Sequence, residues 1–225
     1  MKLAGFILLS FFSTLLFAQE SKEMLILQME GNNYLRESFD EAGKIIRKDL
    51  LKVGKLNESK DQLSVKVKVY NYGKSGNIED SSETKYTCKP NEEEILMNIF
   101  PFAAFSSEKT VKVQLNNEFE LYPHPMKVDL KLEDIAFTVS IEGGALGLFG
   151  TKSKGTVFNR EVVLYDSISK VYTLQSRISI KSFLFGFNFN TISYAVKEKI
   201  HSNKGVLQQV FKEPSGEYFT IKLKQ

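Results

Sequence analysis

Few residues of this 225-residue chain have the types and spacing that catalysis or metal binding requires. The two histidines, His124 and His201, lie far apart, and neither has another metal-type residue at a ligand spacing, so no zinc site is expected. Two prolines flank His124, which favours a rigid surface turn over a general base. Cys88 has no nearby histidine to generate a thiolate, which favours an inert, buried thiol over a nucleophile. We therefore predict no catalytic residue, no metal and no cofactor.

Carboxylates are plentiful, and a glycosidase-like reaction would need two of them to converge from different strands. The candidates are Glu118, Glu120, Asp129, Glu133 and Asp134. Nothing in the sequence determines which of them face each other, so none is assigned a role. A carboxylate-based hydrolase of envelope glycans stays open as an alternative function.

A glycine-rich segment, residues 143–153, resembles a phosphate-binding loop only superficially. Thr151 separates Gly150 from Lys152, so the Gly-Lys-Ser/Thr run that cradles phosphate is broken. We expect a mobile hairpin connection instead. Its Leu146, Leu148 and Phe149 would contact a partner or cover one end of the core.

Four phenylalanines at alternate positions form the most prominent apolar feature: Phe183, Phe185, Phe187 and Phe189. In a single strand, their side chains would lie on the same side. Each aromatic ring buries on the order of 150 to 250 Å², so we expect these rings to belong to the core. The alternative is that a curved sheet leaves them lining a cavity for an acyl chain or another apolar ligand, which makes them the predicted ligand-binding residues.

The elements that must position these residues follow from a two-residue hydrophobic period. Leu63, Val65, Val67 and Val69 alternate with polar residues, and the same pattern recurs at residues 111–115, 126–132, 137–141 and 219–223. Turn signals separate such runs at residues 40–43, 72–77, 143–144, 203–205 and 214–216. For residues 95–100, which precede Pro101, we prefer a strand to a short helix.

The spacing of these signals suggests about ten strands. Alternation with one apolar face favours antiparallel pairing around one core. We therefore predict an all-β protein with a single antiparallel rolled sheet or a partly closed β-barrel. No break in composition marks a second domain, so residues 19–225 are expected to form one β-roll domain.

The first 18 residues have the order of a signal peptide, with Lys2 followed by an apolar run and then Ala18. This run is shorter than the roughly 20 apolar residues of a membrane-spanning helix. We expect cleavage after Ala18, with an uncleaved anchor as the alternative. Lipidation would need a cysteine at position 19, where Gln19 stands, so the exported protein is not expected to carry a lipid anchor.

Charge and cysteine content exclude further classes. The chain has 30 Lys and Arg against 27 Asp and Glu, and its lysines are scattered, which is not a nucleic-acid footprint. One cysteine cannot form an intramolecular disulfide, so the core alone must hold the fold in an oxidising compartment.

Short landmarks distributed over residues 30–225 resemble the TapB-like family of exported proteins from Bacteroidetes, which is related to periplasmic domains of unknown function. Residues 38–44 resemble an early hairpin of that family. Two strands of the family are similar to Tyr86-Thr87-Cys88 and Ile95-Leu96-Met97-Asn98. Its central landmarks are similar to residues 119–123, 126–128 and 132–134. The start of its last hairpin is similar to Lys204-Gly205-Val206. The chain departs from the family at residues 181–185 and in a shortened linker around Asp129. The resemblance implies a rolled or partly closed antiparallel sheet and implies no catalytic residue.

These observations predict a non-enzymatic protein of the periplasm or the extracellular space, peripheral to the membrane at most. Its expected partner is a lipid or other apolar ligand, an envelope component or a partner protein. Besides the hydrolase, a small outer-membrane β-barrel is an alternative, because such barrels also show alternation.

Overall fold

A computed structural model of the chain describes residues 29–90, 92–102, 109–116, 122–123, 126–142, 152–184 and 187–224. The predicted signal peptide, most of the glycine-rich segment, Phe185, His124, Glu118 and Glu120 lie outside these residues. Among the described residues, no helix has the length and hydrophobicity that crossing a membrane requires.

The described chain is almost entirely β-strand. Its strands are β1 (Asn33–Phe39), β2 (Ile45–Ser59), β3 (Gln62–Tyr72), β4 (Ile78–Cys88), β5 (Lys109–Leu115), β6 (Lys131–Leu132), β7 (Ile135–Glu142), β8 (Lys152–Asp166), β9 (Val171–Leu184), β10 (Phe187–His201), β11 (Gly205–Lys212) and β12 (Tyr218–Leu223). Between β4 and β5 the chain forms the short helix α1 (Leu96–Ile99), flanked by 3₁₀ turns at Glu93–Ile95 and Phe100–Phe102.

All described strands belong to one sheet that closes on itself. Its order is β6-β8-β7-β5-β4-β3-β2-β1-β12-β11-β10-β9, and β9 also pairs with β8. Because β6 pairs only with β8, the other eleven strands form a closed ring. The prediction of an all-β, barrel-like sheet is therefore confirmed. One pair, β4 with β5, is parallel, and the others are antiparallel.

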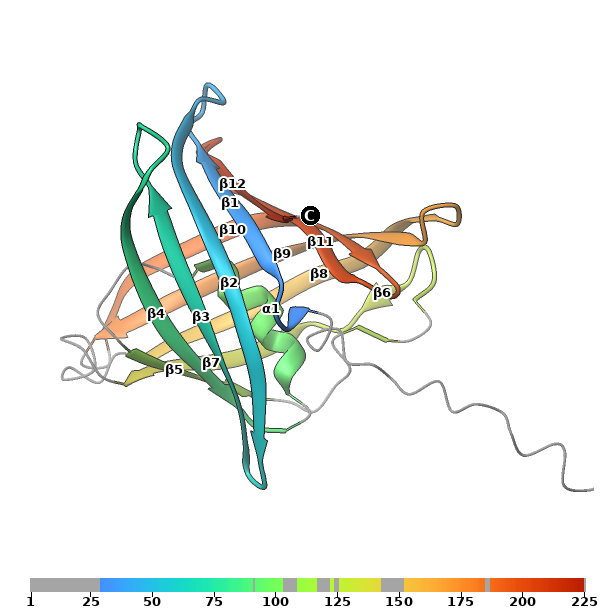
Figure 1. The fold of residues 1–225 in the computed structure, drawn as a ribbon. Coiled ribbons are helices and arrows are strands. Elements are labelled where there is room, and N and C mark those ends of the chain that lie inside the picture. The colour runs from blue at the N-terminus through green and yellow to red at the C-terminus, as the bar shows by residue number, and fades with distance from the viewer. Residues whose placement is uncertain are drawn as a thin grey trace, which may run out of the picture.

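The two ends of the described chain meet within this ring. β1 pairs with β12, so that Tyr34 lies opposite Leu223, and β1 also pairs with β2. In Figure 1 the wall formed by β1 to β4 crosses in front of the wall formed by β7 to β10. A closed sheet has no free edge strand, which removes the usual site of unwanted strand pairing.

The inner face of the sheet holds the hydrophobic core. The alternating residues of β3 that the sequence marks as apolar are nearly inaccessible, with exposed fractions of 5% for Leu63, 1% for Val65 and 0% for Val67 and Val69. Phe137 of β7, Ile178 of β9 and Phe211 of β11 are buried in the same core. The two-residue period therefore correctly predicts which face of these strands is buried.

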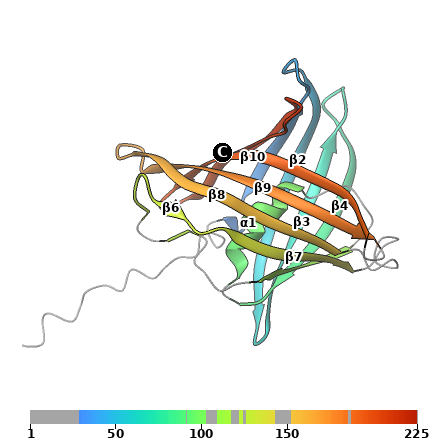
Figure 2. The same cartoon turned by 180° about the vertical axis from the view of Figure 1, so that it is seen from behind.

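The segment from Glu93 to Phe102 lies inside the barrel, and we call it the plug. Figures 1 and 2 both show α1 between the two walls of the sheet, and all four residues of α1 are buried. The strand preferred for residues 95–100 is wrong. A segment enclosed by a closed sheet finds no strand edge with which to pair, so it must satisfy its backbone hydrogen bonds internally, as a helix does. A wide barrel also needs such a filling.

Two other sequence predictions need correction. The alternation at residues 126–132 forms a strand only at Lys131–Leu132, because Asp129 has a left-handed backbone with φ of 62° and its N–H donates to the Val162 carbonyl. The four phenylalanines do not share one strand. Phe183 lies near the end of β9, whereas Phe187 begins β10. The chain reverses between them, because Phe187 pairs with Leu184 and Asn188 with Phe183.

Candidate functional site

A buried polar network surrounds Glu198, which points from β10 into the barrel. Its carboxylate accepts hydrogen bonds from Gln209 Nε2 at 2.6 Å and from the Tyr122 hydroxyl at 3.2 Å. Asn98 of α1 donates to the Tyr122 oxygen at 3.4 Å, and Gln209 Nε2 also donates to the Met97 carbonyl at 3.2 Å. The network therefore joins β10 and β11 to the plug.

Electrostatics within this network follow from burial. Loss of water raises the pKa of Glu198 above its ordinary value, although Gln209, Arg160 and Tyr122 act in the opposite direction. Burial and the neighbouring Glu198 carboxylate raise the pKa of Tyr122, which keeps the phenol protonated as a donor. The Arg160 guanidinium lies 5.9 Å from the Tyr122 ring centre and donates to the Glu133 carbonyl at 2.9 Å.

A second buried cluster holds the other end of the plug. Arg36 of β1 and Asp49 of β2 lie directly opposite each other. Arg36 Nε donates to Asp49 Oδ2 at 2.8 Å, and Arg36 Nη1 donates to the Pro101 carbonyl at 2.9 Å. Arg47 Nε donates to the same carboxylate at 2.9 Å. Asp49 is completely buried, so this cluster fastens the plug to the wall of the barrel.

These two clusters have the geometry of structural supports rather than of a reaction centre. Glu198 exposes 4% of its surface and accepts hydrogen bonds from Tyr122 and from Gln209, which also holds the plug through the Met97 carbonyl. Charged residues in a core are costly unless they are paired and hydrogen-bonded. Asp49 is paired with Arg36 and Arg47, and Glu198 accepts hydrogen bonds from Gln209 and Tyr122. A substrate would have to displace the plug to reach the carboxylate.

Of the residues that the sequence singles out for chemistry, those that the structure describes do not converge with this network. Asp129 and Glu133 are exposed, and Cys88 is buried with an exposed fraction of 4%. His201 accepts a hydrogen bond from the Asn203 N–H at its Nδ1, and partial burial together with Lys204 and Lys170 lowers its pKa. Within the described ranges, no group of three metal-ligating side chains comes together.

The most unusual surface lies where β9 turns into β10. Phe187 exposes 79% of its surface and Phe189 exposes 62%, so neither ring is part of the core that the sequence predicts for it. Phe183 is half-buried on β9. Exposure of two large aromatic rings two positions apart on one strand is unfavourable in water unless they have a partner.

Lysines border these rings. Lys152 of β8 lies opposite Phe183, and Lys154 lies opposite Lys181 of β9. The Lys154 ammonium is 5.8 Å from the centre of the Phe183 ring, so lysine and ring share one face. All three lysines are exposed, and none forms an ion pair with another described residue. We call Phe183, Phe187, Phe189, Lys152, Lys154 and Lys181 the aromatic-basic end.

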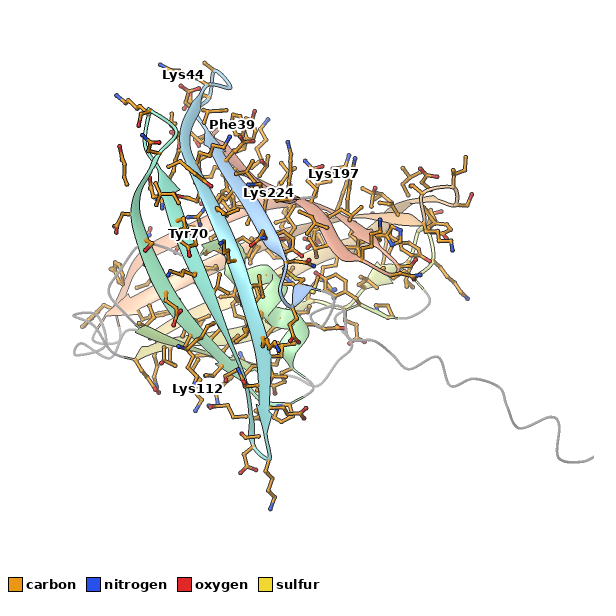
Figure 3. The ribbon with its side chains drawn as sticks, in the orientation of Figure 1. Phe39, Lys44, Tyr70, Lys112, Lys197 and Lys224 are labelled. Atoms are coloured by element: carbon orange, nitrogen blue, oxygen red, sulfur yellow. The ribbon has the colours of Figure 1, made fainter. Side chains whose placement is uncertain are left out.

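Two lysines on the wall formed by β1 to β4 do form ion pairs. Lys48 lies 3.5 Å from Glu37, and Lys66 lies 2.7 Å from Glu83, on the outer face of β1 to β4. Among the described residues, Glu142 is an acidic neighbour of the aromatic-basic end. It is the last residue of β7 and stands two positions after Ser140, which pairs with Lys152. Figure 3 shows that further lysines, among them Lys112 and Lys197, project away from the sheet.

The sequence analysis missed the buried polar residues, although a signal for them exists. Glu198 interrupts the apolar series Val196, Ile200 of β10, and Asp49 precedes Leu51 and Val53 at the same spacing. A charged residue at the inward position of a strand indicates a paired buried charge. The exposure of Phe187 and Phe189 had no such signal, because it depends on where the chain turns.

Comparisons with known proteins give likeness of structure alone. No protein-family model and no curated protein matches this chain. A candidate exported protein with a YMCC-like fold from Bacteroides fragilis is 14% identical, with a TM-score of 0.48 over 87% of this chain and 95% of its own. A candidate lipoprotein from Parabacteroides distasonis is 13% identical, with a TM-score of 0.48 over 88% of this chain and 95% of its own. Likeness at this level carries no information about the function of the present chain, and the TapB-like resemblance stays a prediction.

Proposed function

We propose that this chain is an exported, non-enzymatic protein of the cell envelope that binds an envelope component through the aromatic-basic end. Export follows from the signal-peptide order of residues 1–18. The observation that carries the binding role is the exposure of 79% and 62% for Phe187 and Phe189. Exposed apolar patches of this kind mark interaction surfaces.

The position of the plug supports binding on the outside of the barrel rather than within it. Glu93–Phe102 occupies the interior, and Arg36 and Gln209 hold it there through the Pro101 and Met97 carbonyls. An acyl chain inside the barrel would have to replace this segment. The phenylalanine side chains therefore fit a surface contact better than the internal cavity considered from sequence.

The outer face of the sheet also bears on the alternative of a lipid-spanning barrel. Such a barrel needs an outward apolar band. Here exposed basic residues occupy outward positions of successive strands: Lys154 of β8, Arg177 and Lys181 of β9, Lys197 and Lys199 of β10, Lys212 of β11 and Lys222 of β12. This pattern favours a surface in water, with contact at one end.

The test compares envelope association in cells. The Phe187→Ser and Phe189→Ser double variant is expressed beside the unchanged protein, and the fraction recovered with washed envelope is measured by immunoblotting. The matched control is Ile168→Ser, because Ile168 exposes 95% of its surface in the turn at the opposite end of β9. We expect the double variant to lose envelope association and the control to keep it. Equal recovery of all three proteins would refute the proposal.

A further inference from the structure

We infer that the component bound by the aromatic-basic end is the surface of an anionic phospholipid membrane. This inference rests on the proposed function and specifies its partner. It follows from the combination of exposed aromatic rings with lysines that form no ion pair with another described residue, at one end of the sheet. Each of these features has its own physical role at a lipid surface.

The rings supply the apolar contact. Phe187 and Phe189 expose 79% and 62% of their surfaces at a strand reversal, where they can enter the boundary between headgroups and acyl chains without any change in the sheet. A tight protein interface would instead surround such rings with a shaped pocket. A bilayer accepts them at a projecting end, because it is a deformable apolar phase.

The lysines supply the charge that selects the lipid. Lys152, Lys154 and Lys181 are exposed and form no ion pair with another described residue. The register places Lys154 directly opposite Lys181, which is unfavourable for two like charges unless an anion lies nearby. Anionic headgroups relieve this repulsion, and the long lysine side chains can reach them while the rings are inserted.

One basic residue continues behind this contact. Arg177 lies four residues before Lys181 on β9 and is exposed, whereas Lys197 and Lys199 pair with Gln175 and Thr173 toward the other end of β10. Arg177 therefore extends the positive charge of Lys152, Lys154 and Lys181, and Glu142 at the end of β7 is an acidic neighbour. Net positive charge at this end suits docking on a negatively charged surface.

Binding to protein-free vesicles tests the inference. Co-sedimentation of the purified protein is measured with vesicles of phosphatidylcholine alone and with vesicles containing phosphatidylglycerol. We expect binding only to the anionic vesicles, and its loss in 1 M salt, because the Debye length falls from about 10 Å at 0.1 M to about 3 Å at 1 M.

Two sets of variants separate the roles of rings and charges. Replacement of the three lysines by glutamine should lower vesicle affinity on the order of a hundredfold, since each lysine contributes a factor of about five. Phe187→Ser with Phe189→Ser should lower it roughly tenfold or more. Ile168→Ser should bind as the unchanged protein does. All replaced side chains are exposed, and circular dichroism checks that each variant is folded.

The outcomes distinguish this inference from the proposed function. If the unchanged protein ignores anionic vesicles, or binds them equally after the lysine replacements, the lipid inference is wrong. In that case, phenylalanine-dependent recovery with the cell envelope would still support the proposed function and would indicate a protein or glycan partner. If neither measurement depends on Phe187 and Phe189, both proposals are wrong.

Discussion

Individual polar residues decide how the inside of this barrel is organised. Glu198 and Gln209 on the wall bind Met97 of the plug and Tyr122, while Arg36 binds Pro101 at the other end. A purely apolar interior would allow the plug to slide or rotate, because hydrophobic contacts are not directional. The hydrogen bonds fix its position, at the cost of burying charge.

Glu198 should be the residue whose removal disturbs the core most. Glu198→Ala leaves the buried donors of Gln209 and Tyr122 without their acceptor, so we expect the free energy of unfolding to fall by about 3 kcal/mol. Urea unfolding monitored by circular dichroism measures this difference. Glu217→Gln, at an exposed position, serves as the control. A loss no larger than that of the control would contradict the structural role of the network.

The same residue should make stability depend on pH. Because its pKa is raised in the folded protein, the folded state keeps a proton that the unfolded chain releases above a pKa of about 4.3. The contribution of Glu198 to the free energy of unfolding is therefore largest below pH about 4.3, and it is lost as the pH rises through the raised pKa. Glu198→Gln should flatten this part of the stability curve. If the free energy of unfolding varies with pH above about 4.3 in the same way in the unchanged protein and in Glu198→Gln, burial does not shift the titration of Glu198.

At the scale of elements, the pairing of β7 with β8 depends on one glycine. Gly155 lies opposite Phe137, and a Cβ atom at position 155 would collide with the Phe137 ring. The ring lies over the glycine and is completely buried. This arrangement lets a large aromatic side chain fill the barrel close to the wall, since the glycine leaves space for it.

Gly155→Ala should therefore destabilise the protein by about 2 kcal/mol through overpacking. The change Phe137→Leu, made in the same chain, should recover part of this loss because the smaller side chain leaves room for the new methyl group. Thermal unfolding of the single and double variants measures the coupling. Thr156→Ala, which replaces an exposed neighbour on β8, should have little effect. If the losses of stability caused by Gly155→Ala and by Phe137→Leu simply add in the double variant, the two side chains do not pack as described.

At the scale of the whole molecule, the ring closes through strands from opposite ends of the chain. β12 fills the space between β1 and β11, and the Lys224 N–H donates to the Asn33 carbonyl at 2.8 Å. Without β12, two neighbouring strands would each expose an unpaired edge and part of the core. Closure should therefore make the stability of distant strands depend on the last residues.

Truncation after Gly216 tests this dependence. We expect the shortened protein to lose its cooperative urea transition and to aggregate on size-exclusion chromatography, because β1 and β11 then present open edges. A chain that ends after Lys224 keeps β12 and its hydrogen bond to Asn33, so it should behave as the full chain does. If the chain that ends at Gly216 is monomeric and unfolds cooperatively, closure of the ring is dispensable.

Much of the architecture can be predicted from sequence because the relevant signals are local. The alternation around Val65 and Val67 reports which face of a strand is buried, and the turn residues near Gly43, Gly76 and Gly216 mark hairpins. These features depend on neighbours one to four residues away. They therefore correctly predict an all-β protein with an apolar inner face.

Other features depend on contacts that no local pattern contains. Residues 95–100 have the composition of a strand, yet they form a helix because the closed sheet leaves them no edge to join. Phe183 and Phe187 share a two-residue spacing, yet a chain reversal separates them and exposes Phe187. By itself the sequence determined the period, the turns and the scarcity of catalytic groups. Only the tertiary structure decided the closure, the plug and the exposed aromatic-basic end, because each results from which distant strands pair.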